Sequence, residues 1–274
     1  MHKRSTCTVE ILSVGNELLL GNTINTNASW IAAKITARGG SVTRITTIPD
    51  ELNGIVTAIR ESLRRSPDYI IMTGGIGPTF DDMTVKALAK SIRQRMRVDP
   101  IAIAMIREHY SSKFPNKKIE MTKPRLKMAT IPIKGNAVPN PVGTAPAVHV
   151  KVGKSEIFCL PGVPNEARAI FRNSISKQIQ RKSKGTSFVE QWIRVTGIME
   201  STLAPLVDQV MNRWPQLYIK SHPRGFDGKD TPNIELHISS FAFEREKAEV
   251  DIASATKFLG KKLRGLNDRV HIST

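Results

Sequence analysis

Three glycines and two neighbouring carboxylates follow one apolar run of the chain. The stretch TGGIGPTFDD spans residues 73–82. Backbone amides approach a phosphate closely only where no Cβ blocks them, so Gly74, Gly75 and Gly77 fit an anion-binding turn. Carboxylates beside a phosphate require a cation between them, and Mg²⁺ is commonly held by one or two carboxylates together with phosphate oxygens. The stretch therefore predicts a site for a phosphate and its metal.

Asp81 and Asp82 are the expected metal ligands and catalytic residues of this site. Adjacent residues of a regular helix point about 100° apart, so both carboxylates reach one ion only if one of them lies in the loop. Asp82 is the first choice as ligand. A purely structural alternative is a capping box. In it, Thr79 caps a helix, the Asp82 side chain bonds back to the Thr79 backbone, and Pro78 fixes the entry of the chain.

Strands and helices alternate around this stretch. Residues 9–14, 41–48 and 68–73 have the composition of strands, and residues 26–38 and 51–65 carry apolar residues at helical spacing. This order predicts an α/β fold, with a mostly parallel sheet sandwiched by helices and with ligands bound outside the carboxyl ends of the strands. TGGIGPTFDD lies at such an end.

The rest of the first half continues this pattern. We expect helices over residues 83–95 and from residue 100, an antiparallel hairpin over 147–152 and 155–160, and a helix over 164–181. Residues 136–146 show no periodicity and have no evident core role. A polar loop of this kind is expected to line the crevice.

A polar, charged segment at residues 180–187 lacks periodicity and divides the chain. We expect a nucleotide-binding domain over residues 1–180 and a smaller α+β domain over residues 187–274. The predicted elements of the second domain are strands over 188–196, 217–221 and 233–243 and helices over 200–213 and 244–263.

Composition restricts the partners. The formal net charge of +17 on 274 residues would attract phosphates, although solvated helix faces explain most of it; aromatic residues make up only 5%, so nucleic acid is not the expected partner. No apolar run is long enough to span a bilayer, and no secretory leader or disulfide framework is indicated. The chain is expected to be cytoplasmic, without a membrane partner.

Five motifs together resemble the amino-terminal domain of CinA-type competence-damage proteins, over about residues 8–180. The motifs are GNELLLG at 15–21, Asn27, TGGIGPTFDDMT at 73–84, NPVGTA at 140–145 and LPGVPNE at 160–166. The wider superfamily has the molybdopterin-binding fold of MoaB and Mog proteins. Residues 197–201, GIMES, resemble part of the KH-like domain of CinA proteins.

The resemblance implies a nucleotide site. CinA-type domains are similar to metal-dependent pyrophosphatases that act on ADP-ribose, and related domains of FAD synthases are associated with FAD hydrolysis. Relatives in molybdenum-cofactor biosynthesis instead bind molybdopterin or transfer an adenylyl group to it, and their shared aspartate falls at Asp82. A non-catalytic nucleotide-binding module is a further alternative. Because the chain ends at Thr274, soon after the KH-like part, nicotinamide-nucleotide amidase activity is not expected.

The sequence and the resemblance together suggest further site residues and partners. Glu17 stands just beyond the first predicted strand, at the same sheet edge as Asp82, so it would complete the metal site with Asp81 and Asp82, for Mg²⁺, Mn²⁺ or Co²⁺, with K⁺ as an additional candidate, or would hydrogen-bond a ribose; alternatively, Glu17 is a helix-start carboxylate. The ligand would be a nucleotide or a pterin, bound by a homo-oligomer, and no general base is identifiable. The expected substrate-binding residues are Thr73, Gly74, Gly75, Gly77, Pro78, Thr79, Asn27, Asn140, Gly143, Thr144, Gly162, Pro164 and Glu166.

Overall fold

The computed structural model describes residues 7–116, 118–227, 231–265 and 270–273. Contacts divide the chain into two units. The described residues up to 183, without 37–39, form the larger unit, and those from 184 onward form the smaller one together with 37–39. The change of unit therefore falls inside the polar segment at residues 180–187.

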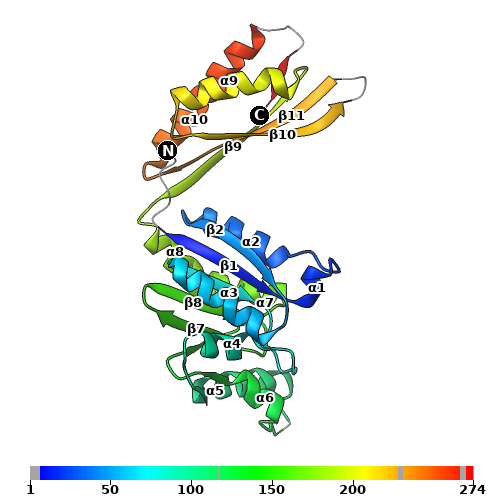
Figure 1. Cartoon of the computed structure of the whole chain (residues 1–274), viewed down its shortest axis with the longest axis vertical. Coiled ribbons are helices and arrows are strands. Elements are labelled where there is room, and N and C mark those ends of the chain that lie inside the picture. Colours follow the sequence, from blue (N-terminus) through cyan, green and yellow to red (C-terminus); the bar gives the residue numbers. More distant parts are fainter. Residues whose placement is uncertain (1–6, 117, 228–230, 266–269, 274) are drawn as a thin grey trace. The chain divides into compact units, whose positions relative to one another are not determined.

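A six-stranded sheet forms the centre of the larger unit, in the strand order β2-β1-β3-β8-β7-β6 (Figure 1). The first four of these strands run parallel, and β7 and β6 are antiparallel to their neighbours. The predicted mostly parallel sheet is confirmed. The strands are β1 (Thr8–Val14), β2 (Ser41–Ile48), β3 (Tyr69–Thr73), β6 (Asn136–Val138), β7 (Ala147–Val152) and β8 (Ser155–Leu160).

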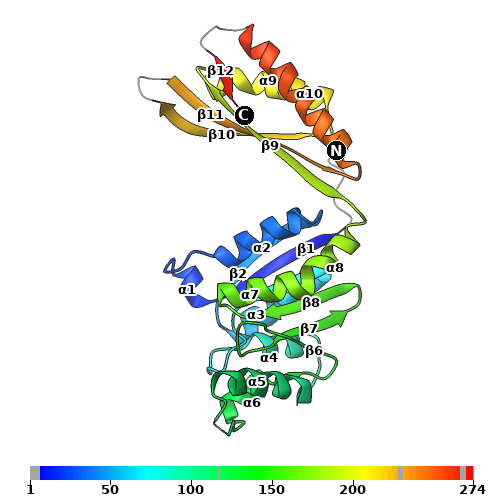
Figure 2. The same ribbon diagram turned by 180° about the vertical axis from the view of Figure 1, so that it is seen from behind.

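Helices cover both faces of this sheet, as predicted (Figures 1 and 2). Val9 and Ile11 of β1 pack in one apolar cluster with residues of α2, α7 and α8, whereas Leu12 and Val14 pack in another with residues of α3 and α4. Strands buried on both faces are typical of parallel sheets. The covering helices are α2 (Thr26–Thr36), α3 (Leu52–Arg65), α4 (Thr84–Ser91), α7 (Pro164–Ile170) and α8 (Ser176–Lys182), with the π-turn η1 (Phe171–Ile175) between the last two.

Within the larger unit, the observed elements differ from the predicted ones mainly by short helices and strands. The helix predicted over residues 83–95 ends at Ser91, and a two-stranded ribbon of β4 (Met96–Val98) and β5 (Thr130–Pro132) follows it. Arg93, in the left-handed region at φ 55°, ends the helical path, and the Arg93 and Gln94 amides donate to the carbonyls of Lys90 and Ala89. Three-residue strands are too short to show a period in the sequence. The other elements are α1 (Asn16–Leu19), α5 (Pro100–Lys113) and α6 (Lys123–Met128).

The smaller unit is an antiparallel sheet in the order β10-β11-β9-β12, with α9 and α10 packed on it. The predicted α+β class is confirmed. Strand β10 extends six residues beyond the predicted end at residue 221, because a register shift between Pro223 and Phe226 accommodates a proline and a glycine. The elements are β9 (Ser187–Thr196), α9 (Glu200–Arg213), β10 (Tyr218–Asp227), β11 (Thr231–Ala242), α10 (Arg245–Arg264) and β12 (His271–Ser273). Within the described residues, no helix is both long and apolar enough to cross a bilayer.

Candidate functional site

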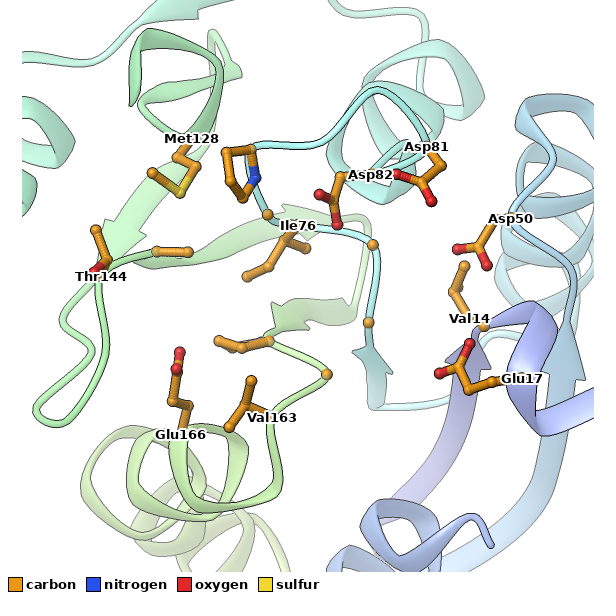
Figure 3. A pocket seen from close by; sticks show the side chains of 18 of the residues that line it. Val14, Glu17, Asp50, Ile76, Asp81, Asp82, Met128, Thr144, Val163 and Glu166 are labelled. Carbon is orange, nitrogen blue, oxygen red and sulfur yellow. The ribbon is translucent and has the colours of Figure 1, made fainter. Parts of the chain in front are cut away.

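Loops that follow four parallel strands meet around one pocket of about 550 Å³ (Figure 3). Parallel strands end at the same edge of a sheet, so loops far apart in the sequence come together there. The volume suits a small-molecule site, for which about 300 to 1,000 Å³ is usual. The contributing segments are Gly15 and Glu17 after β1, Asp50 after β2, residues 74–78 with Asp81 and Asp82 after β3, and residues 161–163 after β8.

The segment from Thr79 to Asp82 forms a closed loop. Asp82 Oδ2 accepts hydrogen bonds from the amide and the hydroxyl of Thr79, at 2.8 and 2.6 Å, and the same hydroxyl lies 2.5 Å from Asp81 Oδ1. Helix α4 begins only at Thr84, with Met83 at the N-cap and no side-chain cap. Thr79 is therefore not the cap of α4. The bond from the Thr79 amide to Asp82 that a capping box predicts is present, but it closes a turn of the loop that borders the pocket, and both carboxylates belong to that loop.

Two hydrogen bonds fix the glycine turn to the sheet and to α4. The Gly74 amide donates to Leu160 O at 3.0 Å, and the buried Thr84 hydroxyl donates to Gly74 O at 2.8 Å. The Gly74 amide is thus used by the fold, which corrects the expectation that it binds phosphate. In the described part of the chain the amides of Gly75, Ile76 and Gly77 donate no hydrogen bond, and all three residues line the pocket. These three amides are therefore available to donate hydrogen bonds to a bound anion.

Four carboxylates lie on one side of the pocket: Glu17, Asp50, Asp81 and Asp82 (Figure 3). Burial raises the pKa of Asp50, and the negative charges of the other three raise it further, against a hydrogen bond of 2.8 Å from the Asn16 amide. Asp50 was missed in the sequence analysis. Its place two residues after the end of β2 is the signal that could have identified it.

The carboxylates suit a hard divalent cation, which prefers oxygen ligands. Across the described ranges, no three histidine, cysteine or carboxylate side chains are close enough together to hold a metal ion by themselves. The predicted ligands Asp82, Asp81 and Glu17 share one side of the pocket without forming a complete cage. This donor set fits Mg²⁺, which usually takes its remaining ligands from phosphate and water.

The opposite side of the pocket is built around Glu166. Asn140 Nδ2 donates to Glu166 Oε2 at 2.7 Å and to Ala145 O at 2.9 Å, and Asn140 Oδ1 accepts from the Gly143 amide at 2.9 Å. A Cβ on Gly143 would lie only 2.1 Å from Glu166 Cδ. Glu166 and Thr144 line the pocket, whereas Asn140 and Gly143 hold them in place.

The remaining predicted residues have distinct positions. Asn27 Nδ2 donates to Gly162 O at 2.7 Å, while Asn25 caps α2 by accepting from the Ala28 amide. Thr73, Asn27 and Pro164 line a smaller neighbouring pocket of about 100 Å³ that shares Val14, Glu17, Gly74 and Gly162 with the main one. Gly162 and Pro78 line the main pocket, and Thr79 lies outside its lining. Tyr110, Met128 and Val163 line it without having been predicted.

Replacing Asp50 with asparagine is expected to raise the Tm by about 1 to 3 °C at pH 7 without divalent ions. The amide removes one of four repelling charges, and its oxygen can still accept from the Asn16 amide. A raised carboxyl pKa gives stability that is present below the ordinary pKa of about 3.9 and is lost as the pH rises through the folded-state value. The gain should therefore vanish near pH 3.5, as calorimetry across pH would show; an unchanged or lower Tm at pH 7 would contradict it.

Known proteins resemble this chain over the region that contains the pocket. Residues 10–181 match the family described as "Probable molybdopterin binding domain". A protein of Pyrobaculum aerophilum is 41% identical over 265 residues, which are 96% of this chain and 97% of the relative. The crystal structure of the CinA protein of unknown function from Thermoplasma acidophilum is 42% identical, with a TM-score of 0.57, over 63% of this chain and 98% of that chain. The chain is a CinA-type member of the molybdopterin-binding domain family.

The CinA-type assignment confirms the resemblance drawn from the five motifs. The carboxylates, the glycine turn and Glu166 of this CinA-type protein all lie inside the matched residues 10–181. A second relative, from Thermoplasma acidophilum, is 39% identical over 92% of this chain and 95% of its own length. The antiparallel unit follows the matched domain in the chain.

Proposed function

We propose that the chain hydrolyses the pyrophosphate bond of ADP-ribose, or of a related dinucleotide such as FAD, with the help of a divalent metal. The observation that carries this proposal is the placement of four carboxylates beside the available amides of Gly75, Ile76 and Gly77. A phosphate bound by the amides would lie near four negative charges. Such a pairing requires a cation between the two groups.

Asp82, with Asp81, Glu17 or Asp50, would hold Mg²⁺, Mn²⁺ or Co²⁺, and K⁺ is a further candidate ion. When bound, the metal would withdraw negative charge from the phosphate oxygens. The amides of Gly75 to Gly77 would bind one phosphate and stabilise the charge that develops during attack. Water adds to one phosphorus and the bridging oxygen leaves with the other phosphate, which yields AMP and a second phosphomonoester.

Glu166 would orient the sugar of the substrate. An ionised carboxylate only accepts hydrogen bonds, so it pairs with hydroxyl donors such as those of a ribose. Asn140 donates to Glu166 Oε2 at 2.7 Å and thereby fixes the carboxylate at the edge of the pocket, where it would accept from a ligand hydroxyl. This role makes Asn140 a positioning residue for Glu166.

Two other functions remain as alternatives. Binding of molybdopterin, or adenylyl transfer to it, is favoured by the description of the matched family. A module that holds a nucleotide without turning it over would use the same glycine turn. Turnover and its products distinguish the three functions.

The test incubates the purified protein with ADP-ribose, FAD, or ATP plus molybdopterin, each with Mg²⁺, Mn²⁺ or Co²⁺. Release of AMP from ADP-ribose or FAD, abolished by a chelator, is the expected result. Pyrophosphate release from ATP only when molybdopterin is present would instead establish adenylyl transfer. Binding of a nucleotide or pterin without product would leave the non-catalytic module.

A further inference from the structure

A second pocket, of about 310 Å³, adjoins the main pocket at the glycine turn. The two pockets share residues 75–77, Asp82 and Met128. All four carboxylates line the main pocket, whereas Asp82 alone among the four also lines the second one. A phosphate bound by the amides of residues 75–77 would therefore border both pockets, and a pyrophosphate there could place its second phosphate away from most of the acidic side.

Lysine side chains border the second pocket. Within the described residues, the lining of the main pocket includes no lysine or arginine, whereas the lining of the second pocket includes Lys86 and Lys127. In a pyrophosphate diester each phosphate carries one negative charge. Since lysine binds phosphate as a compact positive charge, these two side chains are the candidates that could neutralise the second phosphate.

Lys127, near the end of α6, is the better placed of the two lysines. Its ammonium donates to Thr79 O, and its positive charge adds to the hydrogen bond from Thr79 in lowering the pKa of Asp81. Lys127 is half-buried, whereas Lys86 is exposed. An ammonium has three N–H donors, and Thr79 O takes one of them among the residues that the structure describes. Two donors therefore remain for a phosphate at the border of the two pockets.

We propose that Lys127 is a catalytic residue of the pyrophosphate hydrolysis and that its ammonium binds the phosphate that leaves. This inference rests on the proposed function. Water forms a bond to the phosphorus held at the glycine turn, and the bond from that phosphorus to the bridging oxygen breaks. The bridging oxygen leaves with the electron pair and takes one proton of the water, while the other proton stays on the new phosphomonoester. The Lys127 ammonium donates to the leaving phosphate and stabilises the charge that develops on it.

A purely structural role would give Lys127 a different signature. If the bond to Thr79 O only anchored the acidic loop, its loss would weaken every ligand of the glycine turn to a similar extent. A contact with the second phosphate matters only for a ligand that has one. AMP has one phosphate, and the analogue α,β-methylene-ADP has two that water cannot separate. The difference between their affinities therefore isolates the second phosphate.

The test compares Lys127→Met, which keeps an unbranched stem but removes the charge, with the matched control Lys123→Met. Lys123 is exposed, lies one turn earlier on α6 and lines neither pocket. In calorimetric titrations with Mg²⁺, Lys127→Met should raise the Kd of α,β-methylene-ADP about tenfold and leave that of AMP within about twofold of wild type. Its kcat/KM for ADP-ribose should fall by roughly 100-fold. Lys123→Met should change none of these values, and Lys127→Arg should keep most of the affinity for the analogue.

Other outcomes separate this inference from the proposed function. Equal changes of the two Kd values, no change in either, or an unchanged kcat/KM in Lys127→Met would overturn the role of Lys127, while AMP release by wild type upholds the hydrolase. If wild type cleaves neither ADP-ribose nor FAD, the hydrolase fails, and the two Kd values decide whether Lys127 binds a second phosphate. Failure of wild type to bind α,β-methylene-ADP would overturn that binding as well.

Discussion

Replacing Asp82 with asparagine is expected to lower kcat/KM for the pyrophosphate substrate by roughly 100-fold or more. The Asp82 carboxylate lies directly against the glycine turn: a Cβ added to Gly77 would be 2.7 Å from Asp82 Oδ2. A metal held by Asp82 would therefore be next to a phosphate bound at the turn. The free energy of unfolding should change by no more than about 1 kcal/mol, since the amide oxygen can still accept from the Thr79 amide. Steady-state kinetics with urea unfolding measures both effects.

Two further variants assign the loss to charge rather than to loop structure. Asp82→Ala removes the bonds from Thr79 as well as the charge, so it should lose the same activity and additional stability. Asp81→Asn should lower kcat/KM by about tenfold or less, because Asp81 is the more exposed partner of the pair. If Asp82→Asn keeps full turnover, Asp82 is not the metal ligand.

Replacing Gly74 with alanine is expected to destabilise the protein by about 3 kcal/mol and to abolish turnover. Gly74 has φ +93°, and an added Cβ would lie 2.1 Å from Val14 O, a backbone atom of β1. Relief of this clash requires the turn to move away from β1. That movement would break the bond from the Gly74 amide to Leu160 O and displace the amides of residues 75–77.

Gly153→Ala is the matched control for this substitution. Gly153, in the turn between β7 and β8, also has a positive φ of +57°, but an added Cβ would meet no atom within 4 Å. Gly153→Ala should lower the free energy of unfolding by only about 1 kcal/mol, the penalty for an alanine in the left-handed conformation, and should retain turnover. Urea unfolding of both variants measures the difference, and equal losses would show that the approach to β1 is not what requires glycine at position 74.

The architecture of the larger unit was predictable because its signals are local and repeated. Runs such as residues 69–73 are apolar on both faces, and alternation with amphipathic helices leaves few topologies other than a parallel sheet. The same rule places the glycine turn at the carboxyl edge. The meeting of Glu17 and Asp82 in one pocket therefore followed from strand ends, without any knowledge of side-chain contacts.

Contacts over long sequence distances were not predictable in the same way. The use of the Gly74 amide by Leu160 O depends on which strand neighbours β3, and no local pattern encodes that pairing. The support of Glu166 by Asn140 joins residues 26 positions apart. The late start of α4 depends on Thr84, whose hydroxyl and amide bind the carbonyls of Gly74 and Gly75 and so delay the helix beyond the predicted cap.

The acidic side of the pocket draws its four carboxylates from three separate loops, after β1, β2 and β3. The segments after β1 and β2 hold each other, because the Asn16 amide donates to Asp50 Oδ2 and the Asp50 amide donates to Asn16 Oδ1. The loop after β3 is instead held by Leu160 and Thr84. A change at Asn16 or Asp50 therefore alters two of the three segments together, whereas related chains can diverge in ion preference or substrate by exchanging the loop after β3 separately.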